Sequence, residues 1–125
     1  MTVADLFNVK PGEKEQLDQV EETLRREFGE YCEVFRSATR IIDIHAKGVS
    51  KARSARELQQ KLGRKHLVCV GDAENDLSMM RNADYAFAPA DAIIAKHFET
   101  VCNCADGAVA DVICKKIPEI LGLNP

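Results

Sequence analysis

The stretch of sequence that decides the fold is 66–76, which reads His66-Leu67-Val68-Cys69-Val70-Gly71-Asp72-Ala73-Glu74-Asn75-Asp76. Its first part, 66–70, is an apolar run without alternation, which is typical of a short parallel strand covered on both faces. Its second part is polar and opens with Gly71, which allows the backbone to turn sharply. Because ligands of open α/β sheets bind beyond the carboxyl ends of the strands, the polar part lies where a ligand would bind.

Two carboxylates stand in this polar part, at Asp72 and Asp76. They offer two hard oxygen ligands from one loop, and Mg²⁺ binds a few carboxylates together with waters and a phosphate oxygen. An ordinary strand-to-helix turn, with Asp76 as a capping acid, has the same spacing. The loop alone therefore leaves a magnesium site and a structural turn open.

A second polar feature precedes a predicted helix that Ser50 can cap, and it reads Lys47-Gly48-Val49-Ser50-Lys51. A lysine at the start of a helix opposes the helix macrodipole, which favours a functional reason such as phosphate binding. A solvated surface lysine is the alternative, and the position of Lys51 alone leaves both open.

The pattern of the chain changes near residue 47. Before it, a short apolar strand, a helix with apolar residues at helical spacing and a hairpin predict the order β-α-β-β, at 3–9, 17–28, 31–36 and 41–45. After it, helices and strands alternate, which predicts an α/β fold with a parallel sheet. The predicted helices are 50–63, 91–98 and 107–116, with a short one after the polar loop, and the predicted strands are 66–70, 85–88 and 100–104.

Composition excludes several classes of protein. Seventeen basic and twenty acidic residues give a net charge of −3, so neither nucleic-acid binding nor binding to an anionic membrane is favoured. No apolar run approaches the roughly 20 residues of a membrane helix, and the first residues do not resemble a signal peptide. Five cysteines without a secretory context indicate reduced thiols in the cytoplasm.

Taken together, the polar loop and the spaced lysine resemble the haloacid dehalogenase-like (HAD) superfamily, in its subclass of Mg²⁺-dependent phosphatases with a type-2 (IIB) α/β cap. Residues 40–51 are similar to that subclass's run from the last cap strand into motif III, and 70–80 to its motif IV, of form GDxxND followed by an apolar helix. Weaker landmarks match at 82–84 and 106–109. The resemblance covers essentially the whole chain and implies a Rossmann-like, three-layer core with a parallel sheet, preceded by part of the cap.

The resemblance also implies a role for each matched residue. Lys51 would neutralise charge on the transferring phosphoryl group and pair with the nucleophile. Asp72 would bind Mg²⁺ directly, and Asp76 would hold a metal-bound water or the lysine. Asn75 would hydrogen-bond near the phosphate or position the loop. Electrostatic stabilisation of this kind is most of phosphoryl-transfer catalysis.

The sequence departs from the family pattern in three places. Ala52 stands where a glycine usually follows the lysine, and 88–92 replaces the usual glycine-asparagine turn. The family's nucleophile comes from an Asp-x-Asp motif, and no such pair occurs in this sequence. We therefore expect the chain to be the C-terminal half of the enzyme, with 1–46 from the cap and 47–125 from the core.

Two functions follow from this expectation. The first is a phosphatase that acts on a small phosphorylated metabolite through an aspartyl-phosphate, completed by a segment that carries the nucleophile. The second is a non-catalytic remnant, or a subunit that needs a partner. In both, the isolated chain is expected to be inactive, and self-association or a chain with the missing half is expected to cover the strand at 66–70.

Two further alternatives rest on other residues. A receiver-type signalling domain also uses acids, Mg²⁺ and a lysine, but Asp5 is a poor match for its acids near the first strand. The pair Cys102 and Cys104 follows His97, so a soft-metal site is conceivable. Because the two thiols lie two residues apart on a predicted strand, structural thiols on one face are the favoured interpretation.

Overall fold

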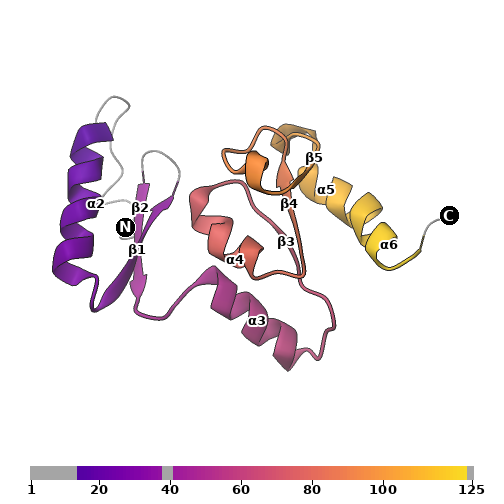
Figure 1. The fold of residues 1–125 in the computed structure, drawn as a ribbon, viewed down its shortest axis with the longest axis horizontal. Helices are drawn as coiled ribbons and strands as arrows, with labels where there is room; N and C mark the ends of the chain where they lie inside the picture. The colour runs from indigo at the N-terminus through magenta and orange to yellow at the C-terminus, as the bar shows by residue number, and fades with distance from the viewer. Residues whose placement is uncertain (1–13, 38–40, 124–125) are drawn as a thin grey trace.

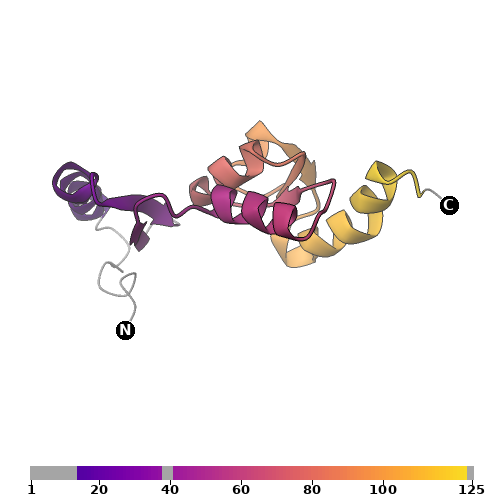
Figure 2. The ribbon, with the colours of Figure 1, turned by 90° about the horizontal axis from the view of Figure 1, so that it is seen from below.

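The structure is a computed structural model that describes residues 14–37 and 41–123. A helix–hairpin unit and a larger α/β unit lie side by side along the long axis of the molecule (Figure 1, Figure 2). A short connection, 47–50, joins the hairpin to the first helix of the α/β unit. Among the described residues, no helix is long and apolar enough to cross a membrane.

The helix–hairpin unit contains α2 (Lys14–Phe28), β1 (Cys32–Ser37) and β2 (Ile41–Ala46). The strands pair antiparallel, with Val34 opposite Ile44, and α2 packs against the hairpin through the buried Leu17, Val34 and Ile42. These elements confirm the predicted helix and hairpin. The predicted strand at 3–9 lies outside the described residues.

The α/β unit is built on a parallel sheet of three strands, β3 (Val68–Val70), β4 (Tyr85–Pro89) and β5 (Glu99–Val101), in the order β3-β4-β5. Alternate strand residues enter two separate apolar clusters. Cys69 and Ala88 lie in one cluster with Met80, and Phe87 lies in the other with Val112. The sheet is therefore covered on both faces, which confirms the α/β class with a parallel sheet.

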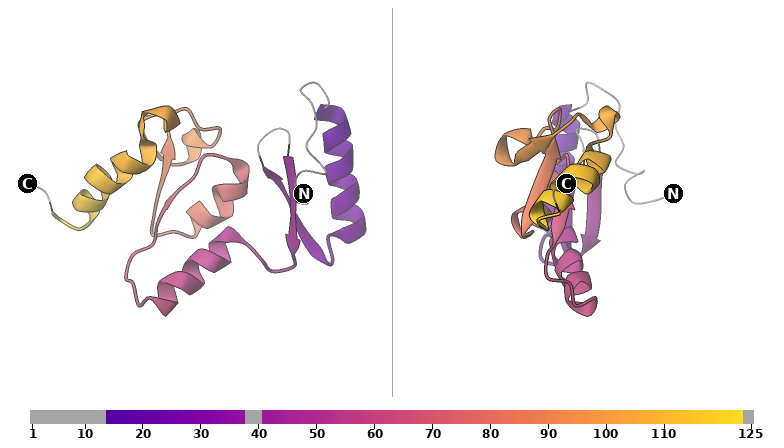
Figure 3. Two further views of the ribbon diagram at one scale, coloured as in Figure 1. Left: turned by 180° about the vertical axis from the view of Figure 1, so that it is seen from behind. Right: turned by 90° about the vertical axis from the view of Figure 1, so that its right-hand side faces the viewer.

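The described part of this unit also contains α3 (Lys51–Lys61), α4 (Leu77–Arg81), α5 (Ala108–Asp111) and α6 (Ile117–Ile120). The apolar clusters place α4 on one face, and α5 and α6 on the other. Helix α3 contacts α4 and leads into β3 (Figure 3). The Ser50 hydroxyl caps α3 by accepting a hydrogen bond from the Arg53 N–H at 3.2 Å, as the sequence predicted.

Near the C-terminus, the predicted helix at 91–98 is wrong, and the predicted strand at 100–104 is present as β5 but ends earlier. Residues 91–98 form successive turns with one 3₁₀ turn, Ala95–His97, instead of a helix. The Asp91 carboxylate accepts a hydrogen bond from the Cys104 N–H at 2.9 Å, and the buried Ile94 anchors the segment in the core. Strand β5 ends at Val101, so Cys102 and Cys104 do not share a strand face, and Cys104 begins the 3₁₀ turn Cys104–Asp106.

The last helical segment continues past Pro118, beyond the predicted end at residue 116. A π-helical turn, Val112–Lys116, lies between α5 and α6, and the Ile117 N–H donates to the Val112 carbonyl. Pro118 follows at the start of α6. Because the wider π turn changes the hydrogen-bond register just before Pro118, the missing proline N–H does not end the helix.

Candidate functional site

The loop after β3 is closed by hydrogen bonds to its own aspartate. The Asp72 N–H donates to Asp76 Oδ2 at 3.1 Å, and the Asp76 N–H donates to the Ala73 carbonyl at 3.0 Å. A 3₁₀ turn, Glu74–Asp76, then runs directly into α4. Asp76 is only 6% exposed, so the loop folds around a buried carboxylate.

Gly71 allows this loop to lie close to α4. A Cβ atom at this position would lie 2.6 Å from both Asp76 Cβ and Met80 Sδ. These distances are shorter than any van der Waals contact, so the glycine is required by the close approach of neighbouring side chains. The sequence predicted the glycine for a sharp turn, and the structure adds this steric reason.

Lys51, the first residue of α3, reaches the same carboxylate. Its Nζ atom donates to Asp76 Oδ1 at 2.6 Å, across 25 residues of sequence. The lysine side chain is 53% exposed, and the aspartate side chain is 9% exposed. Both oxygens of Asp76 are thus engaged, one by the ammonium group and one by the loop backbone.

The surroundings of Asp76 favour its ionised form. Burial by itself would raise the pKa of this carboxyl group. The hydrogen bond and charge of Lys51, with the backbone N–H groups of Asp72 and Ala73, outweigh burial, so the pKa lies below its usual range. The ionised aspartate therefore holds the lysine and the loop in place.

Lys51, Asp72 and Asp76 line one cavity of about 510 Å³ beyond the carboxyl end of β3, together with residues 107–110 at the start of α5. Asp72 is exposed there, in contrast to Asp76. The described residues contain no group of three or more His, Cys, Asp or Glu side chains that could hold a metal by themselves. The cavity can therefore offer a cation one exposed carboxylate, Asp72, beside an ammonium group suited to an anion.

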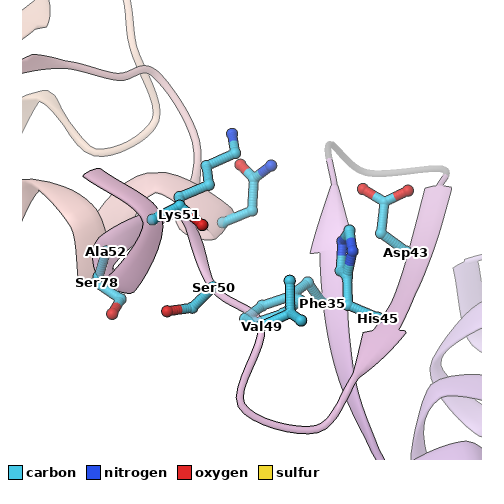
Figure 4. Close-up of a pocket in the computed structure, with 10 residues that line it drawn as sticks. Phe35, Asp43, His45, Val49, Ser50, Lys51, Ala52 and Ser78 are labelled. Carbon is cyan, nitrogen blue, oxygen red and sulfur yellow. The ribbon is translucent and has the colours of Figure 1, made fainter. Parts of the chain in front are cut away.

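A second cavity, of about 490 Å³, lies between the hairpin and the start of α3. Lys51 and Asn75 line it on the side of the α/β unit, while Phe35, Asp43 and His45 line it on the hairpin side (Figure 4). The Phe35 and His45 rings meet edge to face, with centroids 5.6 Å apart. Lys51 thus borders both cavities.

Sequence reasoning missed the hairpin side of this cavity. Phe35 and Asp43 are directly opposite in the β1–β2 register, and His45 follows two residues after Asp43, so all three share one face. The alternation of side chains along the two strands was the sequence signal that places these residues on one face. Only the placement of the hairpin next to α3 shows that this face borders Lys51.

The fold and the site together define an α/β protein in which a lysine–carboxylate pair and an exposed aspartate lie beyond the carboxyl edge of a parallel sheet. The chain belongs to the haloacid dehalogenase-like hydrolase family, whose model matches residues 4–113.

Relatives agree with this assignment. The 5-amino-6-(5-phospho-D-ribitylamino)uracil phosphatase of Escherichia coli is 32% identical over 107 residues, which are 81% of this chain and 39% of that protein. A HAD/COF-like hydrolase from Plasmodium vivax has a TM-score of 0.74 at 27% identity, covering 93% of this chain and 40% of its own. A subclass IIB sugar phosphatase has a TM-score of 0.66 at 23% identity, covering 89% and 41%. The chain thus spans about two-fifths of the length of these relatives.

The lowered pKa of Asp76 predicts a specific dependence of stability on pH. Its carboxylate stabilises the folded state above the ordinary aspartate pKa, and this contribution is lost as the pH falls through the lower folded pKa. We expect Asp76→Asn to be about 1–2 kcal/mol less stable than the wild type near neutral pH, because it loses a charged hydrogen bond.

The difference between the two proteins is expected to shrink below about pH 4, and urea unfolding at several pH values measures it. Two other aspartates also have lowered pKa values, Asp84 because of the Leu67 N–H and Asp111 because of Lys115. Their effect on stability is the same in the wild type and the variant, so it cancels when the two unfolding free energies are subtracted. A difference that stays constant down to about pH 2 would contradict the role given to the Asp76 charge.

Proposed function

We propose that this chain carries the phosphate- and metal-binding part of a Mg²⁺-dependent HAD-like phosphatase that acts on a small phosphorylated metabolite. The observation that supports this most is the 2.6 Å contact between Lys51 Nζ and Asp76, in one cavity with Asp72 at the carboxyl edge of the sheet. Phosphoryl transfer depends on positioned charges of this kind, which offset the negative charge of the phosphoryl group.

Each residue has a separate role in this proposal. The half-exposed ammonium group of Lys51 contacts the phosphoryl oxygens while Asp76 holds it in place. Asn75, in the neighbouring cavity, donates a hydrogen bond to the phosphate or orients the loop. Asp76 acts through Lys51, because both of its oxygens are already engaged.

The loop offers Mg²⁺ only some of the oxygen ligands that the ion needs. Asp72 supplies one exposed carboxylate, and Asp76 can add only a water-mediated contact while it binds Lys51. Mg²⁺ tolerates few protein ligands because waters and a phosphate oxygen complete its octahedron. When bound, the ion would neutralise phosphate charge beside Lys51.

Millimolar Mg²⁺ is expected to shift the backbone amide resonances of 71–76 in an NMR titration, with weak affinity because hydration competes with so few carboxylates. Asp72→Asn is expected to remove these shifts. The control variant Glu22→Gln, at an exposed carboxylate on α2, is expected to retain them. Micromolar affinity, or shifts confined to other residues, would contradict this donor set.

The organic part of the substrate is proposed to occupy the cavity of about 490 Å³ that shares Lys51 with the phosphate site. Its aromatic pair, Phe35 and His45, offers apolar contacts, and the Asp43 carboxylate accepts hydrogen bonds from hydroxyl or amino groups. A phosphatase of a small polar metabolite needs both kinds of contact. The Escherichia coli relative, named for such a phosphorylated metabolite, is consistent with this class.

The nucleophile is proposed to come from another segment with an Asp-x-Asp motif. Its carboxylate would attack phosphorus and form an aspartyl-phosphate as the alcohol leaves with a proton, and water would then cleave the acyl phosphate. A non-catalytic remnant is the alternative, favoured by the lack of an Asp-x-Asp pair in this sequence.

The five cysteines are free in the structure, which supports a reducing, cytoplasmic location.

Phosphatase assays with p-nitrophenyl phosphate and Mg²⁺ test the proposal. The chain alone is expected to release no phosphate. Co-expression with the part of the Escherichia coli relative that this chain does not match is expected to give turnover that Asp72→Ala abolishes and Glu22→Ala, at an exposed position on α2, retains. A stable complex without turnover would favour the remnant, and turnover by the chain alone that Asp72→Ala removes would refute the need for a second segment.

A further inference from the structure

The loop between β5 and α5, residues 102–107, forms part of the wall of the cavity that Lys51 and Asp72 line. Cys104 and residues 107–110 border this cavity. Residues 107–110 have no charged side chain, so they place an uncharged wall beside the ammonium group and the carboxylate. Because charges interact more strongly where water is excluded, the position of this loop affects how firmly the site holds an ion.

Asp91 holds this loop from a different part of the chain. The Cys104 N–H donates to Asp91 Oδ1 at 2.9 Å, and Asp91 lies in the turn after β4. One step earlier, the Ala90 N–H donates to the Val101 carbonyl at 3.1 Å, so the chain after β4 stays beside the chain after β5. Among the described residues, Asp91 is the only side chain outside 102–111 that hydrogen-bonds the loop.

Asp91 lies where the loops after the three described strands of the sheet meet. Asp72 follows β3, Asp91 follows β4 and Cys104 follows β5, and these residues line one small cavity of about 180 Å³. Asp72 and Cys104 also border the larger cavity beside Lys51. The hydrogen bond of Asp91 therefore joins two loops directly next to Asp72.

We propose that Asp91 is a positioning residue of the site formed by Lys51 and Asp72, and that it holds the loop 102–107 where 107–110 complete the wall of the cavity. The inference rests on the proposed function, because it assigns how that site keeps its shape. The role needs an oxygen that accepts the Cys104 N–H, and an asparagine side chain has such an oxygen as well. Asp91 acts through this loop and contacts neither the cation nor the phosphate.

Paramagnetic Mn²⁺ tests where the loop lies relative to the cation site. Mn²⁺ binds the same carboxylate and water ligands as Mg²⁺, and it broadens the amide resonances of residues close to it. In the wild-type chain we expect broadening at 71–76 and at 104–108. Asp91→Ala is expected to retain the broadening at 71–76 and to lose most of it at 104–108. Asp91→Asn is expected to keep both, because its amide oxygen accepts the Cys104 N–H.

Two results of the Mn²⁺ experiment would overturn the positioning role. Equal broadening at 104–108 in the wild type and in Asp91→Ala would mean that the loop keeps its place without Asp91. Loss of the broadening at 71–76 in both Asp91 variants would mean that the Asp91 charge binds the cation itself.

Binding of inorganic phosphate in the presence of Mg²⁺ measures the consequence for the site. We expect Asp91→Ala to raise the phosphate Kd about three- to tenfold, the effect of one hydrogen bond, and Asp91→Asn to stay within about twofold of the wild type. Asp84→Ala is the structural control, because Asp84 accepts the Leu67 N–H at 2.7 Å at the amino end of the sheet. It is expected to lower stability and to leave the Kd within about twofold. An equal rise of the Kd in both alanine variants would overturn the specific role of Asp91.

Failure of the proposed function has a different signature from failure of this inference. A wild-type chain that shows no broadening at 71–76 and binds no phosphate would contradict the proposed function, and the role of Asp91 with it. A wild-type chain that binds both ions, with an Asp91→Ala variant that binds phosphate as tightly, would overturn the role of Asp91 alone.

Discussion

Gly71→Ala is expected to lower the free energy of unfolding of the α/β unit by about 2–3 kcal/mol, because the new methyl group has no space. Its Cβ would lie 2.6 Å from Asp76 Cβ, 2.6 Å from Met80 Sδ and 2.9 Å from Asp76 Cγ. The Met80 side chain can move, but it is 1% exposed and packed in the core. Asp76 cannot move without losing its hydrogen bonds to Lys51 and the Asp72 backbone.

Urea unfolding followed by circular dichroism measures this loss of stability. Gly63→Ala is the matched control, because nothing lies within 4 Å of its Cβ position and only the positive φ of 61° opposes the change. We expect this control to cost about 1 kcal/mol. Equal losses at the two glycines would mean that the close approach at Gly71 is not the cause.

Gly71 and the helix–hairpin unit show which features of the fold could be predicted from the sequence. Gly71 was predicted to be a turn, because it follows an unbroken apolar run. The steric reason depends on Met80, nine residues later and one helical turn into α4, which no local pattern shows. The hairpin and α2 were predicted correctly, because their periodicity reports the one face that each of them buries.

Local propensity failed where a tertiary contact decides the backbone. Residues 91–98 contain two alanines and a lysine, which favour a helix. Asp91 instead binds the Cys104 N–H, and the segment folds as turns around Ile94. The same contact holds Cys104 in a turn beyond the end of β5, so the predicted Cys-x-Cys strand could not form.

For the candidate site, the structure bears directly on one predicted pairing, that of Asp76 with Lys51. The resemblance gave Asp76 two roles, a metal-bound water or the lysine, and the 2.6 Å contact with Lys51 supports the second. The assignments of Asp72 and Asn75 stay predictions, although both border a cavity that Lys51 lines. Phe35, Asp43 and His45 lay outside the predicted site because their relevance depends on how the hairpin packs.

Lys51→Met is expected to lower the free energy of unfolding by about 1–2 kcal/mol. The change removes the ammonium group that binds Asp76 and leaves a 6% exposed carboxylate with only its backbone partners. Losing one partner of a fully buried pair costs about 3–5 kcal/mol, and the smaller figure applies because solvent already screens the half-exposed lysine. The pKa of Asp76 should also rise, since Lys51 is the main group that lowers it.

A double-mutant cycle separates this pairing from other effects of the substitutions. Lys51→Met, Asp76→Asn and the double variant are unfolded in urea at neutral pH, and the coupling energy is expected to be about 1 kcal/mol or more, since the two side chains are in contact. The cycle Lys115→Met with Asp111→Asn is a matched control, because that pair is also in contact but its lysine is 70% exposed. We expect a coupling below about 0.5 kcal/mol there. Equal coupling in the two cycles would mean that Asp76 holds Lys51 no more firmly than a surface ion pair does, and its role in positioning the lysine would then be wrong.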